Sequence, residues 1–399
     1  MIKFGIRHNL IYAMMFVIFN FLRKADSIVM IKYIEYHGSL LLTVLMFIAD
    51  FISGLIAYLY NLKYLREKKA SKFMGIELIQ ASSNIIPPDS CFKIYTLILF
   101  VSFIDFVEYV LSSCYIPVRF KDLPISLEWR LKSVIICMSA LLCYFSLKFP
   151  IFKHQLITIL TILFCLLIVI ITELIVLTQV KNHSLSYVSR VIFLMIIDHI
   201  FNSSIDVIEK YLLEYDFINP YLLLMMEGLF GIILSLLFSI QVNPLKKITT
   251  IYNENSSKTF TYLIVCIVLY FLLSCGRNIY RITTNKLYSP THKALFDYIL
   301  VPLLIIYYYA WDVDFQINEK RVFFYFFVNL IVSFIMVFCG LIYNELIIIF
   351  LCGLEYDTHY EVSKRAKIIE SQAYEMSGNS NGSSFYMDDY KDYVIIHIK

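Results

Sequence analysis

Charged residues are scarce in this chain, and their scarcity excludes most soluble folds. Only 16% of its 399 residues are Asp, Glu, Lys or Arg, whereas 59% are hydrophobic. Soluble domains usually carry about 25% charged residues. Because a soluble core cannot bury so much apolar surface, we expect the chain to fold in a bilayer with membrane lipids around it.

Glycine, proline and cysteine are also few, at 11, 9 and 9 residues. The low Gly and Pro content argues against long flexible linkers. No Cys-x-x-Cys and no Cys/His spacing suited to zinc occurs, so we expect no metal and no cofactor. His-Glu-x-x-His, Gly-x-Ser-x-Gly and a Gly-rich phosphate loop are missing as well, so the sequence does not indicate an enzyme. A net charge of +3 is too small to indicate nucleic-acid binding.

Hydrophobic stretches long enough to cross a bilayer, which takes about 20 helical residues, recur along the chain. They lie at 8–22, 40–62, 92–113, 131–149, 156–180, 188–212, 221–241, 260–275, 295–311 and 323–352. This pattern predicts an all-α integral membrane protein with about ten transmembrane helices.

Basic residues predict the orientation of these helices. Lys63 and Arg66 follow the second stretch, and Arg277 and Arg281 follow the eighth, so the positive-inside rule assigns both loops and both termini to the cytosol. We interpret Arg277 and Arg281 as loop residues that contact lipid headgroups, with capture of an anionic solute as the alternative. Glycosylation sequons at Asn182 and Asn255 fall in loops assigned to the other side. An endomembrane of Golgi, lysosome or vacuole type is favoured over the plasma membrane.

Acidic residues within the apolar stretches are the candidate functional residues, because an ionised carboxylate at the bilayer centre costs roughly 3 kcal/mol. On a helix, Asp198, Asn202, Asp206 and Glu209 share one stripe about 80° wide. We predict substrate-binding or proton-coupling roles for these polar residues: Asp105, Glu108, Asp198, Asn202, Asp206 and Glu227.

Asp105 and Glu108 are one helical turn apart, and two such carboxylates readily share a proton. They are therefore the predicted proton-responsive pair, unless Arg130 or Lys132 satisfies them statically. Structural alternatives remain open for other acids. Glu209 would lie at the membrane interface beside Lys210, and Glu227 and Glu345 would hold helices together.

A segment near the middle of the chain resembles a known family. It reads Ile-Glu-Lys-Tyr-Leu at 208–212, Asn-Pro at 219–220 and Met-Glu-Gly-Leu-Phe-Gly at 226–231. It resembles the drug/metabolite transporter superfamily, in particular nucleotide-sugar-transporter-like solute carriers and chloroquine-resistance-type transporters. The resemblance implies two inverted five-helix repeats around a central cavity. The expected division is a first repeat at 1–182, a second at 183–354 and a polar, disordered cytosolic tail at 355–399.

The predicted function is secondary transport of a small polar solute by alternating access. The excess of acids over bases within the apolar stretches favours a cationic or proton-coupled solute. The alternatives are a nucleotide-sugar-type antiporter, a membrane enzyme acting on lipids, and a scaffold that transports nothing. The expected partners are lipids and the small-molecule solute, with a homodimer left open.

Overall fold

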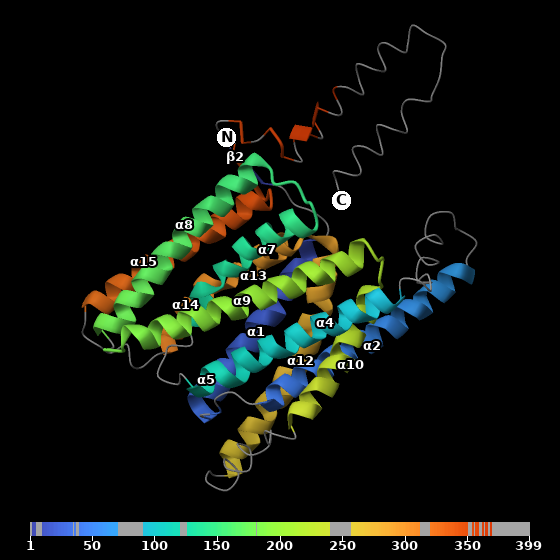
Figure 1. Ribbon diagram of the computed structural model, residues 1–399, viewed down its shortest axis with the longest axis horizontal. Coiled ribbons are helices and arrows are strands. Elements are labelled where there is room, and N and C mark those ends of the chain that lie inside the picture. The colour runs from blue at the N-terminus through green and yellow to red at the C-terminus, as the bar shows by residue number, and fades with distance from the viewer. Residues whose placement is uncertain are drawn as a thin grey trace.

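The computed structural model shows an almost entirely helical protein (Figure 1). It describes residues 2–4, 10–34, 36, 40–70, 91–119, 126–180, 182–239, 257–311 and 320–349, with scattered residues between 353 and 368. The long helices are α1 (Leu10–Ile34), α2 (Leu40–Ala70), α4 (Cys91–Val110), α8 (Lys153–Ile175), α9 (Leu185–Glu214), α10 (Pro220–Ser239), α12 (Ser257–Leu287) and α15 (Lys320–Tyr343). The shorter ones are α5 (Ile116–Arg119), α6 (Ser126–Leu131), α7 (Ser133–Ser146), α13 (Pro290–Tyr298) and α14 (Leu300–Trp311), with π-helical turns at Leu111–Tyr115 and Val176–Val180.

The helices have the composition that a bilayer requires. Within the described residues, seven helices are long and apolar enough to cross a membrane. Large apolar side chains are exposed on α8 and α15, where Phe164 is 64% exposed and Phe334 is 51% exposed. Such surfaces suit lipid, so the chain is an all-α, multi-pass membrane protein, as its composition predicts.

Three predicted boundaries are wrong, because the helices continue past their basic residues. α2 extends to Ala70, so Lys63 and Arg66 lie within a helix and not in a loop. α12 extends to Leu287, so Arg277 and Arg281 lie within a helix and not in a cytosolic loop. α1 likewise continues through Arg23 and Lys24. Hydropathy places a boundary where charge begins, whereas a helix can carry charges inside a protein when neighbouring helices supply partners.

The predicted tenth stretch is also too long. α15 ends at Tyr343, and Glu345 follows in a turn with a φ of 56°. Beyond this turn, β2 (Ile347–Ile349) pairs antiparallel with β1 (Ile2–Phe4). The N-terminal segment and the segment after α15 therefore meet at the same end of the bundle (Figure 1).

Two neighbouring helical segments are interrupted in a similar way. α6 and α7 are separated at Lys132, and α13 and α14 at Ile299. At Ile299 the backbone N–H bonds three residues back, to Phe296 O at 3.3 Å, and Lys132 N–H does the same to Trp129 O at 3.2 Å. Pro302 explains the second interruption, since it has no N–H for the carbonyl of Tyr298. Short 3₁₀ turns within helices often mark hinges.

Candidate functional site

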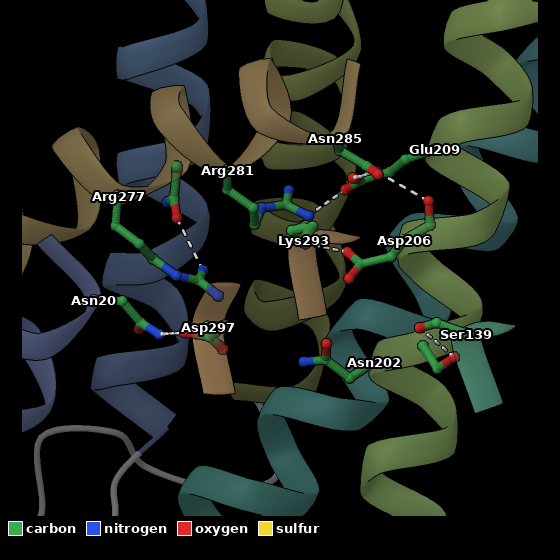
Figure 2. A network of polar contacts seen from close by, with 12 residues as sticks. Asn20, Ser139, Asn202, Asp206, Glu209, Arg277, Arg281, Asn285, Lys293 and Asp297 are labelled. Carbon is green, nitrogen blue, oxygen red and sulfur yellow. Dashed lines mark hydrogen bonds and ion pairs between the residues drawn. The ribbon is translucent and has the colours of Figure 1, made fainter. Parts of the chain in front are cut away.

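Charged side chains from several helices meet inside the bundle, and Figure 2 shows the part around α9, α12 and α13. Lys293 of α13 forms an ion pair with Asp206 of α9. One helical turn further along α9, Glu209 pairs with Arg281 of α12. Asn285 donates to Glu209 and to the Asp206 carbonyl, both at 2.9 Å. The stripe predicted on α9 therefore faces other helices and not lipid.

Arg281 joins two acids from different helices. Besides Glu209, its guanidinium contacts Glu227 of α10 at 3.4 Å. Arg281 is only 6% exposed, Glu227 1% and Glu209 0%. The interpretation of Glu209 as an interfacial residue and of Arg281 as a headgroup contact is therefore wrong, because each neutralises the other inside the protein.

A second group of contacts lies where the two interrupted helices meet. Lys132, at the α6–α7 interruption, pairs with Asp297 at the end of α13. Asn20 of α1 also donates to Asp297, as Figure 2 shows. Beside them Lys24 pairs with Glu128 at 2.8 Å. Both interruptions and α1 are thus joined by polar contacts between side chains.

Asp105 and Glu108 are buried on α4, each 8% exposed. Asn202 of α9 donates to Glu108 at 3.4 Å, and in the described residues no hydrogen bond or ion pair reaches Asp105. Arg130 and Lys132 pair with Glu173 and Asp297, so neither satisfies these two acids. The static alternative based on those bases is therefore wrong. A π-helical turn, a frequent feature of functional sites, begins three residues after Glu108.

Asp198, Asp50 and Asp26 are further buried acids for which the described residues supply no ion pair to a basic Lys or Arg side chain. Asp198 is 3% exposed, and the imidazole of adjacent His199 lies 3.8 Å from its carboxylate. Asp50 of α2 is 2% exposed, and its Oδ1 has no hydrogen-bond partner among the described residues. The interior of the protein therefore contains acids that are neutralised by a base and, close to some of them, acids that form no ion pair with a base of the described chain.

The bases of this interior are not apparent from hydropathy. Arg23, Arg281 and Lys293 are all less than a tenth exposed. A signal was present, because Arg277, Arg281 and Asn285 recur every four residues on one face of a helix. This helical spacing indicates that the eighth helix continues past residue 275 for nearly three more turns.

The remaining predicted sites lie at or beyond the edge of the described chain. Asn182 is exposed just before α9, where a sugar is sterically tolerable. Asn255 and the tail beyond 368 lie outside the described residues. Comparison with models of known protein families and with curated proteins finds no match for this chain.

Proposed function

We propose that this protein is a secondary transporter that moves a small polar solute through the bundle by alternating access. The observation that supports this proposal most strongly is a group of buried acids that form no ion pair with a base in the described part of the chain, among them Asp50, Asp105, Glu108 and Asp198. Unpaired buried carboxylates are expensive in a bilayer and are usually kept for binding or proton transfer. A scaffold would instead pair all its buried acids, so this feature favours transport.

The proposed architecture has ten membrane segments in two inverted repeats. The first repeat consists of α1, α2, α4, α6–α7 and α8, and the second of α9, α10, α12, α13–α14 and α15. α1 and α4 would also span the membrane. They are not among the seven apolar candidates because each carries three or more charged side chains. The interrupted pair α13–α14 would form one segment, as α6–α7 does.

Helix packing supports this repeat. In the proposed repeat α1 corresponds to α9, α2 to α10, α4 to α12, α7 to α13 and α8 to α15. When each helix is replaced by its counterpart, the contacts α2–α10, α8–α15 and α7–α13 stay the same. The same exchange converts α1–α12 into α9–α4, α2–α12 into α10–α4, and α7–α9 into α13–α1, all of which are in contact. Such correspondence is expected of halves related by an axis in the membrane plane, as in inverted-repeat transporters.

Glycines at the α2–α10 crossing fit the same relation. Gly54 follows Asp50 by four residues on α2, and Gly231 follows Glu227 by four on α10. A Cβ on Gly54 would lie 2.6 Å from the Met225 backbone, and one on Gly231 would lie 2.1 Å from the Phe47 ring. Each repeat thus carries an acid and a close-approach glycine at equivalent places. These two helices form the tight centre of the proposed architecture.

The proposed cycle uses the exchangeable ion pairs. Lys132–Asp297 holds the two interruptions together, while Lys293–Asp206 and Arg281–Glu209 hold α9 to the α12–α13 turn. Breaking one group while the other persists would open one side of the bundle at a time. The 3₁₀ turns at Lys132 and Ile299 would serve as the hinges.

Asp105 and Glu108 are expected to supply the proton coupling. The charged groups around them are Lys24, Asp50, Glu128, Glu209, Arg277 and Arg281. In reconstituted vesicles, Asp105→Asn should lower the ratio of uptake with an inward proton gradient to uptake without one towards one. Glu108→Gln should do the same, and the losses should not add if the two acids act as a unit. Uptake across a solute panel, at matched amounts of folded protein, is the measurement.

The matched control is Glu214→Gln, since this acid lies at the end of α9 and is 37% exposed beside Lys210. It should leave the gradient ratio unchanged. If Asp105→Asn and Glu108→Gln reduce only the yield of folded protein and leave the ratio intact, the acids are structural. If no solute of the panel is taken up by the wild-type protein, the transport proposal fails.

A further inference from the structure

Opposite charges lie near each other inside the bundle without forming ion pairs. On one side are the carboxylates of Asp50, Asp105, Glu108 and Asp198, from α2, α4 and α9. On the other are the guanidiniums of Arg23 and Arg277, from α1 and α12. In the described residues no ion pair joins the two sets. Buried opposite charges that stay apart leave both sets incompletely satisfied.

The guanidiniums bind neutral groups. Arg23 donates to Tyr270 Oη at 3.1 Å and to Asn20 Oδ1 at 3.4 Å. Arg277 donates to Tyr109 Oη at 3.2 Å and to Asn278 Oδ1 at 3.0 Å. Three buried donors have no acceptor among the described residues, namely Arg23 Nε, Arg277 Nε and Asn278 Nδ2. Arg23 is 8% exposed and Asn278 0%, so solvent has little access to this face.

The carboxylate face shows the complementary deficit. Asp50 Oδ1 and Asp198 Oδ1 are buried and accept no hydrogen bond from any described residue. Asp105 has no hydrogen bond within the described chain, and Glu108 receives one long bond from Asn202 at 3.4 Å. Because ionised carboxylates accept several hydrogen bonds, these oxygens can accept more from a group with N–H donors.

The two faces are close to one another. Tyr109 follows Glu108 on α4 and receives the bond from Arg277, so one guanidinium lies beside the acidic face. Arg277 also lies within electrostatic reach of both Glu108 and Asp50, and Arg23 within reach of Asp50. The Arg277 guanidinium and the carboxylates of α2 and α4 therefore lie in the same part of the bundle.

We propose that the solute is a small zwitterion carrying one carboxylate and one ammonium group, as amino acids and short peptides do. Its carboxylate would take the free donors of Arg23, Arg277 and Asn278. Its ammonium would take the free oxygens of Asp105, Glu108 and Asp198. This inference rests on the proposed transport function and replaces the expectation of a purely cationic solute. That expectation counted the acids of the apolar stretches and overlooked the bases buried with them.

Three probe sets that share their side chains and differ in the charge of the backbone groups test this inference. They are a mixture of neutral L-amino acids, the corresponding amino-acid amides, which are cations, and the N-acetyl amino acids, which are anions. Binding is measured as the rise in unfolding temperature of the purified full-length protein, and transport as uptake into vesicles. We expect the amino acids to bind and to be taken up, and the amides and N-acetyl compounds to bind at least tenfold more weakly, the loss expected for one charge-assisted contact.

Variants at Arg277 test whether the guanidinium face binds the carboxylate of the solute. Arg277→Gln should weaken amino-acid binding roughly tenfold and leave amide binding unchanged, and Arg277→Lys should restore part of the difference. The matched control Arg190→Gln changes an exposed arginine near the start of α9 and should alter neither. The amide arm also reports whether Arg277→Gln still folds and binds.

The outcomes separate this inference from the transport proposal. Amides that bind and enter vesicles as well as amino acids would overturn the zwitterion and keep a cation transporter. Uptake of other solutes, with no effect of any probe set, would also overturn the zwitterion alone. No uptake of any solute would remove the transport function itself.

Discussion

Arg281→Gln is expected to cost the folded protein about 3–5 kcal/mol, the usual loss when one partner of a buried ion pair is removed. The guanidinium neutralises Glu209 and contacts Glu227, and all three side chains are less than a tenth exposed. Without it, two carboxylates would remain in a low-dielectric interior with Asn285 as the main remaining donor. We expect a much lower unfolding temperature and a poor yield of folded protein.

A triple variant distinguishes lost neutralisation from lost packing. Arg281→Gln combined with Glu209→Gln and Glu227→Gln removes the charges together and should recover most of the stability. The control Arg190→Gln changes an exposed arginine and should shift the unfolding free energy by less than about 0.5 kcal/mol. Equal effects of Arg281→Gln and Arg190→Gln would show that the ion pairs contribute little.

Lys132→Gln and Asp297→Asn should each destabilise the protein by about 2–3 kcal/mol, somewhat less than Arg281→Gln. The Lys132 and Asp297 side chains are 18% and 14% exposed, so some water reaches the pair. The exchange Lys132→Asp with Asp297→Lys restores the opposite charges in reverse and should recover at least half of either loss. The measurement is thermal unfolding of the purified variants.

The same exchange also tests the hinge role of this pair. Spin labels on α6 and α14 should report a wider distance distribution in Lys132→Gln than in the wild type, because the two interruptions are no longer joined. The exchanged variant should return towards the wild-type distribution. Unchanged distances in all three proteins would show that the Lys132–Asp297 pair does not control the separation of the two helices. Another contact would then have to hold one side of the bundle closed.

The sequence predicts the parts of this structure that depend on local pattern. Period 3.6 on α9 correctly places Asp198, Asp206 and Glu209 on an inward face. The interruption at Ile299 was not predicted, although Pro302 three residues later explains it. Ion pairs between helices depend on the tertiary structure, so the hydropathy of a single segment cannot predict them. For that reason the sequence predicts the end of a transmembrane helix before Arg277 and Arg281, although acids from other helices neutralise Arg281 inside the bundle.

The interruption at Lys132 shows another limit of sequence reading. No proline or glycine marks it, and it is identified only by its 3₁₀ hydrogen bond and by the partner Asp297. Asp105 and Glu108 behave differently. Their position was predictable, but the absence of a base beside them follows only from seeing where Arg130 and Lys132 are engaged.

The most direct test of a wet, alternately opened interior is cysteine accessibility at position 202. In a background without the native cysteines, Asn202→Cys is treated with a membrane-impermeant thiol reagent from each side in turn, and Phe193→Cys, 62% exposed on the lipid-facing side of α9, is the control. The transport account predicts that position 202 reacts from both sides and that an effective solute shifts the balance, while position 193 reacts from neither. A folded protein in which position 202 reacts from neither side would contradict the account.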